Sequence, residues 1–143
     1  MIAVPRSGAL RPLHPLHAIL LAFPLTLFAG ALASDLAYWW SFHIQWANFS
    51  SWLIAGGLLF GAFAVLCALV DLFRSGLARI GRLIIYIVVL LAMWGLGFVN
   101  ALVHAKDAWA TMPEGLYLSV LTALLALVAA WIGYSGFRTG EAR

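Results

Sequence analysis

Four long apolar runs, separated by short polar stretches, dominate the pattern along the chain. They cover about residues 16–37, 51–70, 83–103 and 116–136. A helix needs roughly 20 residues to cross a hydrocarbon core about 30 Å thick, and each run meets that length. Open strands would leave backbone groups without hydrogen bonds in lipid. The pattern therefore predicts an all-α fold, with residues 1–143 forming one domain that is an integral membrane four-helix bundle.

Composition excludes most other classes of protein. Of the 143 residues, 65% are apolar and 9% are charged, whereas soluble domains average about 45–50% and about 25%. These values exclude a disordered chain, a nucleic-acid-binding domain and an ordinary soluble enzyme. The lipid bilayer is therefore the first predicted partner, and nucleic acid is not expected as one.

Charge is distributed unevenly between the two predicted faces of the membrane. If the N-terminus is cytoplasmic, Lys106 alone of the eight Lys and Arg residues lies outside. Cytoplasmic loops carry the excess of Lys and Arg in membrane proteins, so both ends of the chain are predicted inside, in a bacterial inner membrane. The predicted outer loops, about residues 38–50 and 104–115, hold the aromatic residues expected at an interface, which are Tyr38, Trp39, Trp40, Trp46 and Trp109.

The first apolar run has a second interpretation. Arg6 and Arg11, followed by an apolar stretch and by Ala31-Leu32-Ala33 before Ser34, resemble a cleavable signal peptide. The run is longer than a usual signal core and continues to Trp40, so we expect it to be retained as the first helix. Cleavage would leave three helices, and the N-terminal sequence of the mature protein distinguishes the two outcomes.

Small residues at a spacing of four predict close packing between helices, because association in lipid relies on close approach of backbones. Three of the predicted helices carry such series. They are Ala22, Thr26, Gly30 and Ser34 on the first, Gly57 and Gly61 on the second, and Ala126, Ala129, Ala130 and Gly133 on the fourth.

Polar residues form two clusters, one at each predicted face of the membrane. The inner, structural cluster consists of His14, His17, Asp71 and Arg74. Asp71 ends the second run, where the helix dipole disfavours an anion, so a cationic partner such as Arg74 or a histidine is expected. The outer cluster consists of Asp35, His43, Gln45, Asn48, Asn100, His104, Asp107 and Glu114. Asp35 and Asn100 lie deepest in it, and buried polar groups in a bilayer need partners.

Histidines in a membrane bundle raise the question of haem b, which requires two ligands at one depth on facing helices. His17 and His104 lie at opposite ends of outward-running helices, about a membrane thickness apart. His43 and His104 are thus the candidate metal ligands, both near the outer surface. Asp107, one turn after His104, is placed to orient its ring.

A quinone is the alternative cofactor at the same depth. His104 would donate to a carbonyl oxygen, and Trp46 and Trp109 would flank the ring. In a third interpretation no cofactor is present, since interfacial histidines bridge solvent and backbone and tryptophans anchor helices at the headgroups.

Other chemistries lack support in the sequence. There is no HExxH, CxxC or GxSxG motif and no glycine-rich loop followed by Lys. The single cysteine, Cys67, lies inside an apolar run, and the middle of each run lacks an ionisable residue. A standalone enzyme is therefore not expected.

The string from His14 to Pro24, HPLHAILLAFP, resembles the opening of a bacterial inner-membrane family catalogued as domain of unknown function twenty-two thirty-one. That family has His-Pro-x-His near the start of its first helix and Phe-Pro within it, and residues 45–52 and 100–109 look like a proteobacterial branch. The chain departs from the pattern at Ala22, where many members have a further histidine. The resemblance implies four membrane helices. Members of this branch are often encoded beside periplasmic quinoprotein sugar dehydrogenases, so it also implies such a dehydrogenase as a partner.

Together these observations predict a membrane anchor or electron-relay subunit for a periplasmic oxidoreductase, with quinone or haem b at the outer face. Its cofactor-binding residues would be His43, Trp46, His104, Asp107 and Trp109. The alternative is a cofactor-free structural or assembly protein. The sequence leaves the oligomeric state open, a homo-oligomer included.

Overall fold

The computed structural model describes residues 14–74, 80–106 and 110–135, and within these ranges the chain forms four α-helices. They are α1 (Pro15–Ser41), α2 (Ile44–Arg74), α3 (Ile80–His104) and α4 (Glu114–Ser135). All four are long and apolar enough to cross a membrane. The predicted all-α fold with four membrane-length helices is confirmed.

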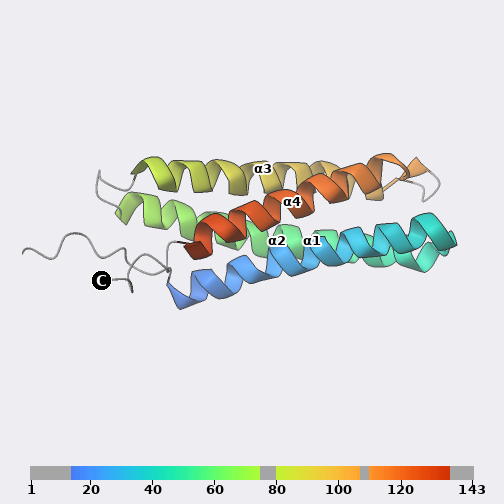
Figure 1. The fold of residues 1–143 in the computed structure, drawn as a ribbon, viewed down its shortest axis with the longest axis horizontal. Coiled ribbons are helices and arrows are strands. Elements are labelled where there is room, and N and C mark those ends of the chain that lie inside the picture. The colour runs from blue at the N-terminus through green and yellow to red at the C-terminus, as the bar shows by residue number, and fades with distance from the viewer. Residues whose placement is uncertain (1–13, 75–79, 107–109, 136–143) are drawn as a thin grey trace, which may run out of the picture.

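The helices lie side by side in an up-down-up-down arrangement (Figure 1). Both α1 and α3 pack against α2 and α4, so the helices form a closed ring in which α1 and α3 are opposite each other. The proximal end of the bundle, as we call it, holds the start of α1 and the end of α4. The distal end holds the α1–α2 link and the connection from α3 to α4.

The link between α1 and α2 is much shorter than the predicted outer loop at about 38–50. Only Phe42 and His43 separate the two helices. Phe42 has a left-handed backbone (φ 55°) and its N–H donates to the Tyr38 carbonyl oxygen, which ends α1. Hydropathy shows where apolar side chains stop, whereas the backbone hydrogen bonds of a helix continue until a residue interrupts them.

The middle of the core is built around Phe28 of α1, which is 1% exposed. A Cβ atom at Gly57 of α2 would lie 2.8 Å from the Phe28 ring, and one at Gly97 of α3 would lie 3.0 Å from it. The two glycines therefore make room for a large aromatic ring between the helices.

The predicted small residues of α2 and α4 are buried, whereas the series predicted for α1 holds only in part. Ser34 is buried and Gly30 packs close to Leu53, but the first two members are wrong. Ala22 and Thr26 are exposed. The buried face of α1 consists of His17, Leu21, Pro24, Phe28, Ala31, Ser34, Asp35 and Tyr38. Large side chains on α1 thus pack against small residues on the neighbouring helices. Leu21 is an example, because it lies so close to Gly133 of α4 that a Cβ atom there would collide with it.

Candidate functional site: two buried histidine pairs

The proximal pair joins His17 of α1 to Asp71 of α2. His17 is 2% exposed, and its Nδ1 lies 3.2 Å from Asp71 Oδ2. Its Nε2 lies 3.0 Å from the hydroxyl oxygen of Tyr86 on α3. Asp71 therefore has a histidine as its partner, and three helices are connected through one imidazole.

The other members of the inner cluster lie apart from this pair. His14 is exposed and precedes α1, where its Nδ1 accepts a hydrogen bond from the Leu16 N–H at 3.3 Å. Arg74 is exposed at the last position of α2.

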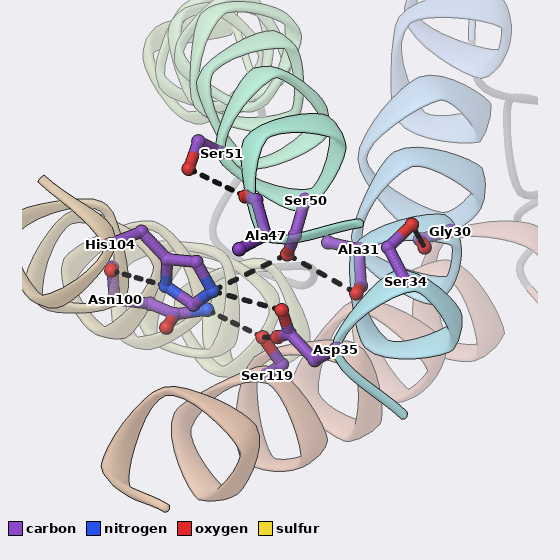
Figure 2. A network of polar contacts seen from close by, with 10 residues as sticks. All are labelled: Gly30, Ala31, Ser34, Asp35, Ala47, Ser50, Ser51, Asn100, His104 and Ser119. Carbon is purple, nitrogen blue, oxygen red and sulfur yellow. Dashed lines mark hydrogen bonds and ion pairs between the residues drawn. The ribbon is translucent and has the colours of Figure 1, made fainter. Parts of the chain in front are cut away.

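The distal pair joins Asp35 of α1 to His104 of α3. His104 Nε2 lies 3.0 Å from Asp35 Oδ1, and the two side chains are 1% and 0% exposed. His104 Nδ1 lies 3.0 Å from the Asn100 carbonyl oxygen, one turn earlier on α3. Figure 2 shows the imidazole held between its own helix and the carboxylate of α1.

Serine side chains from the two remaining helices complete the distal network (Figure 2). Ser119 of α4 donates to Asp35 Oδ2 and accepts from Asn100 Nδ2 at 2.8 Å. Ser50 of α2 lies 3.4 Å from His104 Nε2 and donates to the Ala31 carbonyl oxygen at 3.3 Å. All four helices thus contribute to one buried polar network. Within the described residues, Asn100 Oδ1 has no hydrogen-bond partner.

The proximal and distal layers lie at matched heights on opposite helices. Eighteen positions separate His17 from Asp35 on α1, and eighteen separate Tyr86 from His104 on α3. At 1.5 Å per residue this is about 27 Å, close to the thickness of the hydrocarbon core. Each layer therefore spans the bundle diagonally near one edge of the apolar region.

A pocket of about 460 Å³ opens at the distal end, and His104 contributes to its wall. Six of its eight lining residues are polar, and the lining comes from the start of α2, the end of α3 and the turn before α4. Its polar members are Gln45, Asn48, Ser51, His104, Lys106 and Thr111. Through His104, one member of the buried Asp35–His104 pair thus borders a pocket that is open to the surface.

Gly115 of α4 makes room for the His104 ring. A Cβ atom there would lie 2.9 Å from His104 Cε1 and 2.8 Å from Thr111 Cγ2. A larger residue would displace the imidazole or the turn that forms one side of the pocket.

The structure places the residues predicted for the outer site in different surroundings. His104 is buried and borders the pocket, whereas His43 is exposed in the α1–α2 link. Trp46 is 42% exposed on α2 and is not part of the pocket lining. Asp107 and Trp109 lie outside the described residues.

The arrangement does not fit a haem held by His43 and His104. Both ring nitrogens of His104 already face protein atoms, namely the Asn100 carbonyl and the Asp35 carboxylate. Iron ligation would require one of these contacts to break. Among the residues that the structure describes, no group of three or more His, Cys, Asp or Glu side chains is placed to hold a metal ion.

Ser50 and Ser119 are the members of this site that sequence reasoning missed. Serines in apolar helices also bond to their own backbone, as Ser34 does to the Gly30 carbonyl at 2.8 Å, so residue type alone does not single them out. A signal was available for the Asp35–His104 pair itself. Asn100 and His104 are four residues apart, which puts both on one face of α3, and the deep residue Asp35 needs a partner.

Four apolar helices of membrane length, joined by buried polar layers near both ends, define a polytopic helical membrane protein. The model of the family described as Predicted membrane protein (DUF2231) matches residues 13–136, and the chain belongs to this family. A search of curated proteins and a search of solved structures each gave no match.

Proposed function

We propose that the distal pocket binds the headgroup of a quinone and that the protein is the membrane subunit of a periplasmic oxidoreductase. The observation that carries this proposal is that His104, buried in the bundle and paired with Asp35, borders a pocket lined mainly by polar residues near one edge of the apolar region. Of the cofactor-binding residues named from the sequence, the proposal keeps His104.

The chemistry of the pocket suits a quinone. Quinone carbonyl oxygens accept hydrogen bonds. Lys106 and Asn48 offer N–H donors around the pocket, and His104 would offer its Nε2–H by exchanging the Asp35 contact for the quinone oxygen. Reduction of a quinone to a quinol takes up two electrons and two protons. A site with this role needs a group that holds a proton, and a histidine paired with a carboxylate is such a group.

The proposed setting is the bacterial inner membrane, with the distal end toward the periplasm. The excess of Lys and Arg in the proximal segments supports this orientation. The proposed partner is a periplasmic quinoprotein dehydrogenase, whose electrons the pocket would receive. The resemblance of residues 45–52 and 100–109 to the proteobacterial branch of the family supports that choice.

Quinone binding is tested on protein purified in native lipid. Quinones extracted from the preparation are quantified, and a short-chain ubiquinone analogue is titrated by calorimetry. We expect His104→Gln to weaken binding at least about tenfold, which corresponds to one lost charge-assisted hydrogen bond. His17→Gln is the matched control because it alters a buried, Asp-paired histidine at the other end, and it should leave binding unchanged. Absence of quinone from the wild type, or equal losses in both variants, would contradict the proposal.

A partner is sought by affinity purification of the chain from its native membrane. We expect a periplasmic dehydrogenase to co-purify, and His104→Gln to reduce dehydrogenase-to-quinone activity with normal membrane levels of the chain.

The second candidate is a cofactor-free structural or assembly protein. The observation that favours it is that the distal network connects all four helices, as a purely structural layer also would. Under this candidate His104→Gln lowers the amount of protein in the membrane, or has no effect, and leaves the specific activity of any partner unchanged.

A further inference from the structure

We infer that His104 carries a proton on both ring nitrogens, as an imidazolium paired with the Asp35 carboxylate, and that Ser119 and Asn100 are positioning residues that hold this carboxylate. The inference concerns the protein without any ligand. Its consequence for the pocket rests on the proposed function.

The hydrogen bond to Asn100 places the first proton. The Asn100 carbonyl oxygen lies 3.0 Å from His104 Nδ1, and a carbonyl oxygen can only accept. Nδ1 therefore carries a hydrogen in this geometry, whatever the state of the other nitrogen.

The surroundings of Nε2 place the second proton. Nε2 faces Asp35 Oδ1 at 3.0 Å and Ser50 Oγ at 3.4 Å. The Ser50 hydroxyl donates to the Ala31 carbonyl, so its lone pairs are left for Nε2. Ser50 can therefore only accept from Nε2, which favours a hydrogen on this nitrogen, and that hydrogen also serves an ionised Asp35 at Oδ1.

The rest of the network directs its donors toward Asp35. Asn100 Nδ2 donates to Ser119 Oγ at 2.8 Å, and the Ser119 hydroxyl donates to Asp35 Oδ2. The carboxylate therefore accepts one hydrogen bond on each oxygen. Such a chain of donors stabilises the charged form of the acid, because hydrogen bonds to an ionised acceptor are stronger than neutral ones.

The proximal histidine provides a contrast within the same molecule. His17 has the Asp71 carboxylate at Nδ1, but its Nε2 faces the Tyr86 hydroxyl, which can donate. A neutral ring with hydrogen on Nδ1 satisfies every partner of His17. The two buried histidines, each paired with an aspartate, are therefore inferred to differ by one proton.

For the pocket, this means that a proton is held on a buried ring beside the site where the proposed quinone would bind. His104 can give up the Nε2 proton and remain hydrogen-bonded to Asn100 through Nδ1. Asp35 then acts through His104 as a positioning residue.

The proton count is measured by solid-state NMR of ¹⁵N-histidine-labelled protein in lipid bilayers without quinone. A pH of about 8 is suitable because an ordinary histidine, with pKa near 6.5, is neutral there. We expect two protonated ring nitrogens on His104 and one on His17, with signals assigned by His104→Gln and His17→Gln. One protonated nitrogen on His104, together with an infrared carbonyl band from a protonated carboxyl group, would overturn the inference.

Variants of the two aspartates distinguish a specific effect on the His104 protons from a general loss of stability. Asp35→Asn should remove one of the two ring protons of His104, and Asp35→Glu should restore it. Asp71→Asn is the matched control and should leave the His104 signals unchanged. If Asp35→Asn does not fold, the infrared spectrum of the wild type still decides, because the inference requires an ionised Asp35. Two protons on His104 in a protein that binds no quinone would overturn the proposed function and leave this inference intact.

Discussion

The two aspartates of the buried pairs differ most in their access to water. The side chain of Asp35 is 0% exposed, whereas that of Asp71 is 43% exposed. Water can solvate Asp71 and its surroundings when the pair is broken, but it cannot reach Asp35. The same kind of pair should therefore contribute very differently to stability at the two ends.

We predict that Asp35→Ala lowers the free energy of unfolding by about 3–5 kcal/mol, because His104 and Ser119 are left buried without an acceptor. Asp71→Ala should cost about 1–2 kcal/mol, because it removes one hydrogen bond from a neutral His17 and leaves no buried charge without a partner. Unfolding in mixed detergent micelles at neutral pH measures both. Equal losses would show that burial does not control the strength of these pairs.

At single positions the sequence predicted some of the site and missed the rest. Asp35 and Asn100 were recognisable because polar residues in an apolar run need partners. Pairing of Asp35 with His104 was not predicted, since it depends on which faces of two opposite helices turn inward. Ser50 and Ser119 carried no distinguishing signal.

At the scale of the elements, close packing depends on which helix supplies the large side chain. Phe28 of α1 occupies the space left by Gly57 and Gly97, while the small residues Ala22 and Thr26 face outward. Hydropathy predicted the four helices well because membrane length constrains each run. It could not predict the rotation of a helix that is apolar all round, nor the two-residue link at Phe42 and His43.

We predict that Gly57→Ala costs about 1–3 kcal/mol of stability, because the new Cβ would lie 2.8 Å from a Phe28 ring that also lies close to Gly97. Gly95→Ala is the control in a comparable mid-helix position, since a Cβ there meets nothing within 4 Å. It should be neutral or stabilising by up to about 1 kcal/mol through helix propensity. Thermal unfolding of the two variants in detergent provides the comparison, and a fully stable Gly57→Ala would refute this account of the core.

For the whole molecule, orientation decides which compartment the pocket faces. We predict that alkaline phosphatase fused within the α1–α2 link is active, because this enzyme needs the periplasm, and that a fusion after Arg74 is inactive. The reason is the cationic character of the proximal segments. The opposite pattern would place the pocket in the cytoplasm and exclude a periplasmic partner.

The eighteen-residue spacing between the two polar layers also limits the bilayers that suit this protein. Lipids with long acyl chains would draw both pairs below the headgroups, at a cost of fractions of a kcal/mol for each ångström of mismatch. We therefore expect resistance to unfolding to decline as acyl chains lengthen, which a series of phosphatidylcholine vesicles would reveal. In a cell whose membranes differ in thickness, this cost of mismatch would favour the presence of the protein in the thinner ones.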